Sequence, residues 1–196
     1  CEKCNVAFIG PSAEVISRMG NKSEAKNTMR KAKVPVVPGT KEPVYTVEQA
    51  LEAVKEIGFP VMIKASAGGG GKGMRVAGNE QEFAKLFETA QQESVHSFSD
   101  NTMYLERFVE NPRHVEVQIL ADKYGNVVHL GERDCSVQRR HQKMIEESPC
   151  IAISDDLRKK MGETAVRAAK AAGYESAGTI EFLLDQSGEF YFMEMN

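Results

Sequence analysis

Along the first half of the chain, apolar positions recur with helical spacing between residues that start and stop helices. Pro11 and Ser12 are typical of a helix start, and the stretch from Thr46 to Gln49 has the spacing of a capping box. Asn79 can cap a further helix with one apolar face. These signals predict helices over residues 11–20, 23–33, 46–58 and 79–94, the second of them basic.

Other segments have the apolar runs or the alternation of β-strands. The run from Val6 to Gly10 is expected to be the end of a buried strand. Residues 114–120 alternate between polar and apolar side chains, as a half-buried strand does. Ser154 can cap a helix that ends at Ala172. Further strands are predicted over residues 59–64, 74–77, 103–109, 127–130, 177–184 and 190–196.

A glycine loop separates two of these predicted strands. Lys64 lies at the end of the first strand, and the glycines at 68–71 and 73 follow it. A loop with so few side chains lets backbone N–H groups approach an anion, usually phosphate. A Walker A loop needs Ser or Thr after Lys72, where Gly73 stands, and a dinucleotide fingerprint must open a helix. We therefore predict a glycine flap over a phosphate tail, with a merely flexible hairpin loop as the alternative.

Composition is that of an ordinary globular protein, with 41% hydrophobic and 27% charged residues in 196. The formal net charge is −3, so no overall positive field points to nucleic acid or to a membrane surface. No apolar run has the length of a membrane span, and no signal peptide is visible. We therefore expect neither nucleic acid nor membrane as a partner.

The cysteines and the chain ends suggest a cytoplasmic piece of a longer protein. Cys1 and Cys4 form a lone Cys-x-x-Cys with no second pair at zinc spacing, which favours a reduced cytosolic pair over a metal or redox role. The sequence opens without Met and stops at Asn196, directly after a strand-like run. The expectation is a chain cut at both ends.

Carboxylates in the last predicted hairpin favour a divalent cation. If Ser187-Gly188 is the turn centre, Glu181 lies directly across from Glu194, and Asn196 shares the face of Glu194. Opposed carboxylates repel and would weaken the pairing of the two strands, and a cation between them cancels this repulsion. Oxygen ligands of this kind suit Mg²⁺ or Mn²⁺. Two exposed strand glutamates are the alternative interpretation.

A basic cluster runs from Gln138 through Arg139, Arg140 and His141 to Lys143. Such a cluster attracts phosphate or a small carboxylate-like substrate, although charge runs are also common on solvated faces. His114 shares the polar face of its strand with Glu116 and Gln118, where a histidine is either structural or borders a site. A strand-end lysine, a glycine flap, acidic strands and a basic patch together predict chemistry on ATP without Walker or kinase motifs.

The chain resembles the biotin carboxylases of the ATP-grasp superfamily, and the matching runs follow one another along nearly its whole length. The resemblance implies an α+β fold: an ATP-grasp domain in which two lobes with antiparallel sheets sandwich ATP. The matching runs are Phe8-Ile-Gly-Pro-Ser, Met19-Gly-Asn-Lys22, Lys64-Ala-Ser-Ala-Gly-Gly-Gly-Gly-Lys-Gly-Met, Glu110-Asn-Pro-Arg-His114-Val-Glu-Val-Gln, Glu132-Arg-Asp-Cys-Ser-Val-Gln138-Arg-Arg-His-Gln-Lys143, Gly178-Thr-Ile-Glu181-Phe and Phe192-Met-Glu-Met-Asn196.

The same resemblance implies a domain division. Residues 1–20 would be the end of an N-terminal biotin carboxylase domain, and residues 21–196 would be the ATP-grasp domain. Within it, residues 35–108 would form a mobile lid lobe with the flap, and residues 109–196 an incomplete catalytic lobe.

The implied activity is the ATP- and Mg²⁺-dependent carboxylation of biotin on a carrier protein, with bicarbonate activated as carboxyphosphate. Lys143 would hold bicarbonate, with His141 also counted as catalytic. Glu181, Glu194 and Asn196 would ligate Mg²⁺. The residues implied to contact ATP are Lys22, Lys64, Gly70, Gly71, Glu106, Arg107, Phe108, Val109, His114, Gln138, His141 and Glu181.

The sequence departs from the family pattern at its end, because the arginine and glutamate that orient and deprotonate bicarbonate in the family would follow Asn196. We therefore expect the chain itself to be inactive in biotin carboxylation. A carrier protein or domain and a carboxyltransferase component are the implied partners, with a homodimer possible for the full enzyme. Another ATP-grasp ligase, such as a carbamoyl-phosphate synthetase, and a nucleotide-binding module without turnover remain the alternatives.

Overall fold

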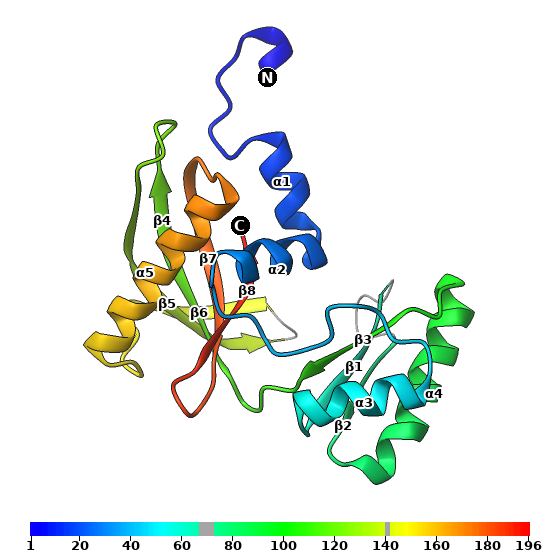
Figure 1. Ribbon diagram of the computed structural model, residues 1–196. Helices are drawn as coiled ribbons and strands as arrows, with labels where there is room; N and C mark the ends of the chain where they lie inside the picture. Colours follow the sequence, from blue (N-terminus) through cyan, green and yellow to red (C-terminus); the bar gives the residue numbers. More distant parts are fainter. Residues whose placement is uncertain (67–72, 140–141) are drawn as a thin grey trace. The chain divides into compact units, whose positions relative to one another are not determined.

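The computed structural model describes residues 1–66, 73–139 and 142–196. The chain divides into two compact units (Figure 1). Unit 1 consists of Cys1–Val36 and Asn111–Asn196, and unit 2 is Val37–Glu110. Among the described residues, no helix combines the length and the apolar content needed to cross a bilayer.

Unit 2 is a small antiparallel sheet with two helices. Strand β1 (Val61–Ala65) lies between β2 (Met74–Ala77) and β3 (Met103–Arg107), and α3 (Val47–Ile57) and α4 (Glu80–Phe98) pack on the sheet. Phe83 and Phe87 of α4 are fully buried together with Ile63 and Leu105 of the sheet. The predicted strands on either side of the glycine loop are therefore confirmed as an antiparallel pair, with Lys64 opposite Met74.

The helix caps of unit 2 follow the sequence signals closely. Thr46 Oγ1 accepts a hydrogen bond from the Gln49 amide N–H, and the Asn79 side chain caps α4 in the same way. The Gln49 side chain reaches back to the Tyr45 amide rather than to that of Thr46, over 2.9 Å. Helix α4 continues to Phe98, beyond the predicted end at Ser94, because Ser94 is fully buried and no Gly or Pro interrupts the next turn.

Unit 1 is built on a five-stranded antiparallel sheet in the order β6-β5-β4-β7-β8. The strands are β4 (Arg113–Ala121), β5 (Val127–Arg139), β6 (Gln142–Glu147), β7 (Ser176–Leu184) and β8 (Phe190–Met195). The helices are α1 (Ala13–Gly20), α2 (Lys22–Lys31) and α5 (Asp155–Ala172), with a short 3-10 turn at Glu2–Cys4.

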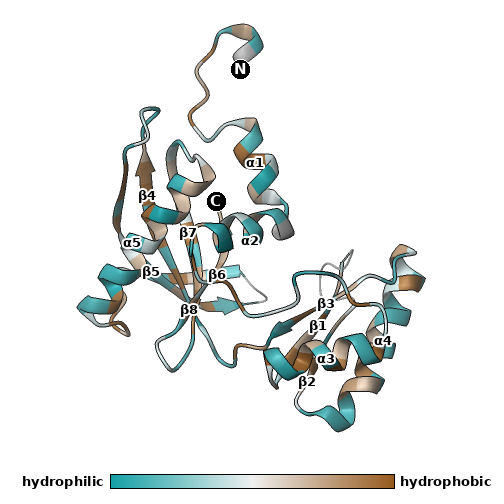
Figure 2. Cartoon of the chain, in the orientation of Figure 1, coloured by the Kyte–Doolittle hydropathy of each residue, from teal (hydrophilic) through white to brown (hydrophobic). Residues whose placement is uncertain are grey.

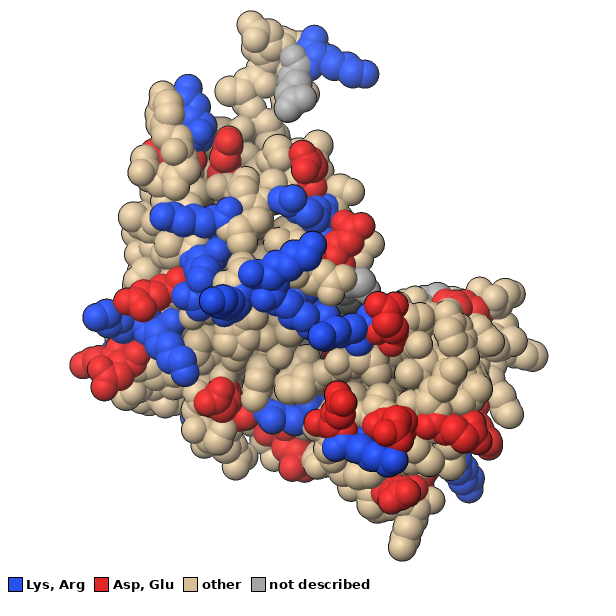
Figure 3. Space-filling view, in the orientation of Figure 1, with Lys and Arg blue, Asp and Glu red and all other residues tan. Residues whose placement is uncertain are grey.

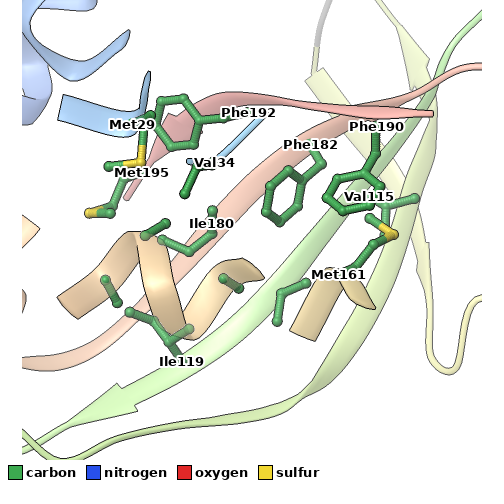
Figure 4. Packing of buried hydrophobic residues seen from close by; sticks show 14 of the residues in the cluster. Met29, Val34, Val115, Ile119, Met161, Ile180, Phe182, Phe190, Phe192 and Met195 are labelled. Carbon is green, nitrogen blue, oxygen red and sulfur yellow. The ribbon is translucent and has the colours of Figure 1, made fainter. Parts of the chain in front are cut away.

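One face of this sheet is buried by the helices. Val115 and Phe182 of the sheet pack with Met161 of α5 and Met29 of α2 in one apolar core (Figure 4). Arg18 of α1 donates to the carbonyl of Ala172, the last residue of α5. In Figure 2 brown residues lie where helices meet the sheet, and in Figure 3 Lys and Arg side chains gather on the helical side of unit 1. The opposite face of the sheet is left for polar side chains.

Two sequence predictions for unit 1 need correction. The segment from Val6 to Gly10 is not a buried strand: it has no strand structure, and Ile9 is 91% exposed. An apolar run is buried only if a sheet or helix covers it. Among the described residues, no strand pairs with the segment from Val6 to Gly10. The polar stretch from Glu132 to Glu147, to which no element was assigned, contains the end of β5 and all of β6.

Candidate functional site

The polar face of the unit 1 sheet gathers charged side chains from several strands. His114, Glu116 and Gln118 alternate with the buried Val115 and Val117 along β4, as the sequence predicted. Strand pairing puts Glu116 opposite Glu181 of β7 on one side and opposite Arg133 of β5 on the other. Residues paired in this way point to the same face, so the alternation of β4 organises the whole cluster.

Glu181 is the centre of this cluster and is only 3% exposed. Its Oε1 accepts hydrogen bonds from Lys143 Nζ at 2.9 Å and from Asn196 Nδ2 at 2.8 Å. Its Oε2 lies 2.5 Å from His114 Nε2. A buried carboxylate needs such partners, because burial without them would favour the neutral acid.

A second carboxylate shares Lys143 with Glu181. Lys143 Nζ also donates to Glu116 Oε2, and Arg133 Nε donates to Glu116 Oε1 at 2.5 Å. Arg133 then donates to Gln118 over 2.9 Å. The result is a continuous network in which Lys143 lies between two buried carboxylates, Glu116 and Glu181, and Arg133 pairs with Glu116 alone of the two.

The hydrogen bonds of Gln138 indicate which ring nitrogen of His114 donates and which accepts. The Gln138 amide nitrogen donates to the Cys135 carbonyl at 2.7 Å and lies 2.6 Å from His114 Nδ1. An amide N–H₂ can only donate, so His114 Nδ1 accepts and the ring proton is on Nε2, where it is donated to Glu181.

These contacts shift the pKa values of both charged partners. Burial alone would raise the pKa of Glu181, but hydrogen bonds from His114 and Lys143 outweigh it and lower the pKa to about 2. Burial alone would lower the pKa of Lys143, yet the hydrogen bonds to Glu116 and Glu181 raise it. At neutral pH Glu181 is therefore ionised, as a metal ligand must be. Lys143 is cationic, as a group that attracts an anion must be.

A pocket of about 370 Å³ opens over this network. It is lined by Pro112, His114, Ser136, Gln138, Lys143, Glu181, Leu183, Met193 and Glu194. Several of the residues predicted to be functional thus line one pocket within unit 1. The pocket has a cationic side at Lys143 and an anionic side at Glu181 and Glu194, so it suits a ligand that carries both an anion and a metal.

Two of the three predicted metal ligands, Glu181 and Glu194, line this pocket. Glu181 lies directly across from Glu194, as predicted, and Asn196 follows β8 with its amide nitrogen on Glu181. The two carboxylates fit Mg²⁺ in chemistry and in charge, whereas Asn196 would have to turn its amide to present oxygen. One ligand atom each of Glu116, Cys135 and Glu146 also lies within 4.8 Å of the others. Burial raises the pKa of the Cys135 thiol, and Glu116 pairs with two cations, Arg133 and Lys143, whereas among the described residues Glu181 pairs with the single cation Lys143, so this group is an ion-pair network.

The buried thiol of Cys135 belongs to the same network but is unreactive. Burial, followed by the nearby Glu116 charge, raises the pKa of Cys135 to about 12. The thiolate, which is the nucleophilic and metal-binding form, is therefore scarcely populated at neutral pH.

In unit 2, Lys64 contacts another residue that the sequence had singled out. Lys64 Nζ lies 2.5 Å from Glu106 Oε2. Arg107, Phe108 and Val109 follow along the same segment; Phe108 donates its amide N–H to the Pro60 carbonyl, and Val109 is buried. The segment is therefore fixed by backbone bonds.

Some predicted site residues have no described geometry, and some site residues were not predicted. Gly70, Gly71 and His141 lie outside the described residues, and for Lys22 only its place at the start of α2 is described. Glu116 was placed on the polar face by its alternation but was given no role. Arg133 was missed, because the stretch around it carried no recognisable strand pattern.

Comparison with known proteins decides the family. Residues 21–196 match the family model described as "Carbamoyl-phosphate synthase L chain, ATP binding domain". The chain belongs to this family. Within it, the resemblance to the biotin carboxylases is confirmed by close relatives with that name.

The relatives of this ATP-binding domain match over its whole length. A biotin carboxylase of Nostoc sp. (strain PCC 7120) is 59% identical over 196 residues, which are 44% of its own length. Biotin carboxylase 1 of Bacillus subtilis is 53% identical, again with 44% of its length covered. The small subunit of the 2-oxoglutarate carboxylase of Hydrogenobacter thermophilus is 50% identical, with 42% covered. The chain thus spans less than half the length of these relatives.

Solved structures support the same assignment. The biotin carboxylase domain of a thermophilic 2-oxoglutarate carboxylase, bound to bicarbonate, matches with a TM-score of 0.92 at 46% identity, over the whole chain and 42% of the other. A biotin carboxylase–β-γ-ATP complex from Campylobacter jejuni matches with a TM-score of 0.83 at 54% identity, over the whole chain and 44% of the other. The predicted ATP-grasp fold of the biotin carboxylases, with its antiparallel sheets, is confirmed by these matches.

Proposed function

We propose that this chain is the ATP- and Mg²⁺-binding part of a biotin carboxylase. In the proposed reaction, a bicarbonate oxygen attacks the γ-phosphorus of ATP and gives carboxyphosphate and ADP. Carboxyphosphate then releases CO₂ and phosphate; N1 of biotin on a carrier protein gives up its proton to the released phosphate and takes up the CO₂. The observation that carries the proposal is the ionised Glu181, held among Lys143, His114 and Asn196 at a pocket that Glu194 also lines.

The residues of unit 1 have distinct roles in this proposal. Glu181 and Glu194 would hold Mg²⁺, with Asn196 as a further ligand after its amide turns. Bound there, the metal would neutralise charge on the phosphates of ATP. Lys143, whose raised pKa keeps it cationic, would attract bicarbonate and hold it electrostatically. Glu116 would keep Lys143 in place from the other side.

Further proposed contacts to ATP come from the rest of the chain. His114 and Gln138 would contribute from unit 1, and Lys64 would contribute a positive charge for the phosphates from unit 2. The backbone from Glu106 to Val109 would meet the adenine. Lys22, Gly70, Gly71 and His141 complete the proposed set.

The remaining proposals concern the partners, domain division and location of the whole enzyme. A biotin carrier, a carboxyltransferase component and a second copy of the enzyme are proposed partners; one 2-oxoglutarate carboxylase relative was solved as a domain dimer with MgADP, ADP and bicarbonate. The division into residues 1–20, a lid lobe over 35–108 and a catalytic lobe over 109–196 is likewise proposed. So is a cytoplasmic location, although several relatives are named as chloroplastic.

Calorimetry tests the binding half of this proposal. The chain is titrated with ATP in Mg²⁺ and again in EDTA. We expect binding with Mg²⁺ and clearly weaker binding without it, because Glu181 and Glu194 would hold the cation and its charge would offset that of the phosphates. Absence of ATP binding under both conditions would refute the proposal.

The second test concerns the acceptor of CO₂. In a protein that contains this chain and has the full length of its relatives, bicarbonate-dependent phosphate release should rise with free biotin. Stimulation by ammonia instead would favour a carbamoyl-phosphate synthetase, the enzyme after which the family is named.

A further inference from the structure

Lys64 and Glu106 form a short, partly buried ion pair that the proposed function does not explain. Lys64 Nζ lies 2.5 Å from Glu106 Oε2, and the side chains are 33% and 17% exposed. Lys64 pairs with Tyr104 across β1 and β3, and Glu106 pairs with Met62. The two charged residues are thus diagonal neighbours on one face of the unit 2 sheet.

The loop before α3 holds Glu106 in place from the other side. Arg107 donates its amide N–H to the Pro38 carbonyl at 2.8 Å, and Gly39 forms a β-bridge with Glu106. A Cβ on Gly39 would meet the Leu105 carbonyl oxygen at 2.4 Å and Glu106 Cγ at 3.0 Å. Only glycine lets the loop lie this close, so the backbone that carries the carboxylate is fixed on both sides, while the lysine stem is the adaptable partner.

A carboxylate on a phosphate-binding lysine has two opposite effects. It orients the ammonium group, which saves some of the rotamer entropy of the lysine stem. It also neutralises that charge and repels an incoming phosphate, and this repulsion is strong where the pair is partly shielded from water. With a phosphate oxygen and the carboxylate both within reach of one ammonium group, the repulsion is the larger effect.

We propose that Glu106 is a specificity-determining residue that competes with phosphate groups for Lys64. A bare phosphate chain then binds poorly, and occupancy of the site requires the additional contacts of a whole nucleotide. The inference rests on the proposed role of Lys64 in binding the phosphates of ATP. It assigns to Glu106 a side-chain role distinct from the proposed backbone contact with adenine.

The test measures three ligands with the Glu106→Gln variant, which keeps the shape of the side chain and removes its charge. The probes are tripolyphosphate, adenosine and ATP, each titrated calorimetrically. Tripolyphosphate should bind the variant about ten-fold more tightly than the wild type, and adenosine should gain nothing. ATP should bind more tightly as well, but by a smaller factor.

Glu52→Gln is a matched control, because Glu52 Oε2 also lies 2.5 Å from a lysine, Lys55, in the same unit. That pair is 72% and 74% exposed, so the variant removes the same charge from a solvated pair. It should leave all three affinities unchanged within two-fold. If circular dichroism showed that Glu106→Gln had lost its fold, Glu106→Asp, which draws the carboxylate back by one methylene, should act in the same direction more weakly.

The outcomes separate this inference from the proposed function. ATP binding by the wild type together with unchanged or weaker tripolyphosphate binding by Glu106→Gln would overturn the inference alone, and would mean that Glu106 orients Lys64. An equal gain for adenosine would also overturn it, because the effect would not concern phosphate. Absence of ATP binding by wild type and variant would overturn the proposed function and the inference with it.

Discussion

Glu181 lies directly across from Glu194, although the strand residues nearer the turn are paired in a different register. Phe182 pairs with Phe192, so an uninterrupted ladder would have put Met193 opposite Glu181. A β-bulge between these pairs adds one residue to β8 and brings Glu194 into position. The local irregularity of the sheet thus creates the pair of opposed carboxylates at the pocket.

The first prediction concerns the cation at this pair. MgATP should raise the melting temperature of the wild type, because a ligand at 100 times its Kd adds about 2.7 kcal/mol to the free energy of unfolding. Glu194→Gln should reduce this rise, since one of the two proposed carboxylate ligands is lost. Glu189→Gln, which removes an exposed carboxylate just before β8, is the control and should melt as the wild type does. A double Gln variant at 181 and 194 that gains as much as the wild type would contradict the metal assignment.

The second prediction concerns pH and Asp134, which is not one of the proposed metal ligands. Burial would raise the pKa of Asp134, but hydrogen bonds from Ser136 outweigh it and lower the pKa from its ordinary 3.8. A folded-state pKa below the unfolded one stabilises the protein above pH 3.8, and this contribution is lost as the pH falls further. Asp134→Asn should therefore destabilise by ~1–3 kcal/mol at pH 7 and by less at pH 3.

Urea unfolding at both pH values measures that difference. Asp156→Asn, at an exposed position in the first turn of α5, is the control and should cost little at either pH. A stability loss for Asp134→Asn that stays constant down to pH 3 would show that the ionised carboxylate is not what stabilises this region.

Much of the local structure could be predicted from short-range signals. Thr46, Asn79 and Ser154 cap the helices that follow them, because a cap depends on a hydrogen bond three residues away. The pairing of Glu181 with Glu194 was also predicted correctly, but from an assumed turn centre that does not describe the pairing nearer the turn. The bulge that restores the pairing has no signal in the sequence.

The remainder of the site depends on contacts between distant segments. Arg133 and Lys143 reach Glu116 only because β5 pairs with β4 and β6 pairs with β5 in the sheet. The end of β5 and the whole of β6 consist mostly of polar residues in the sequence, so apolar alternation does not mark them as strands. For the run from Val6 to Gly10 a strand was predicted and none formed. Its composition is typical of a strand, but in the described structure no helix or sheet covers it.

The third prediction tests the positive charge of Lys64. Lys64→Met keeps most of the bulk of the side chain and removes its ammonium group. Charge-assisted contacts contribute ~1.5–3 kcal/mol, so the affinity for ATP should fall roughly ten- to a hundred-fold. Lys55→Met, in the exposed pair with Glu52, should leave the affinity unchanged. Calorimetry on the three proteins decides, and equal affinity for ATP in wild type and Lys64→Met would reject the assignment.

The fourth prediction concerns the close approach of backbone at Gly178. A Cβ there would meet the Tyr174 hydroxyl at 2.2 Å and the Asn196 carbonyl oxygen at 2.5 Å. Asn196 is held by paired backbone hydrogen bonds to Thr179, so it has little room to move away. Gly178→Ala should therefore destabilise unit 1 by ~1–3 kcal/mol and displace Asn196 from Glu181. Urea unfolding gives the first effect, and a smaller MgATP-induced rise in melting temperature gives the second.

Two further variants make this prediction specific. Gly20→Ala, at the end of α1, has no atom within 4 Å of the added Cβ and should be neutral or slightly stabilising. Adding Tyr174→Phe to Gly178→Ala removes the hydroxyl oxygen but leaves the Asn196 carbonyl, so only part of the stability should return. Full recovery in that double variant would mean that the tyrosine alone excludes a side chain at position 178. A Gly178→Ala protein as stable as the wild type would mean that the strands can part without cost, and that the position of Asn196 is not fixed by this contact.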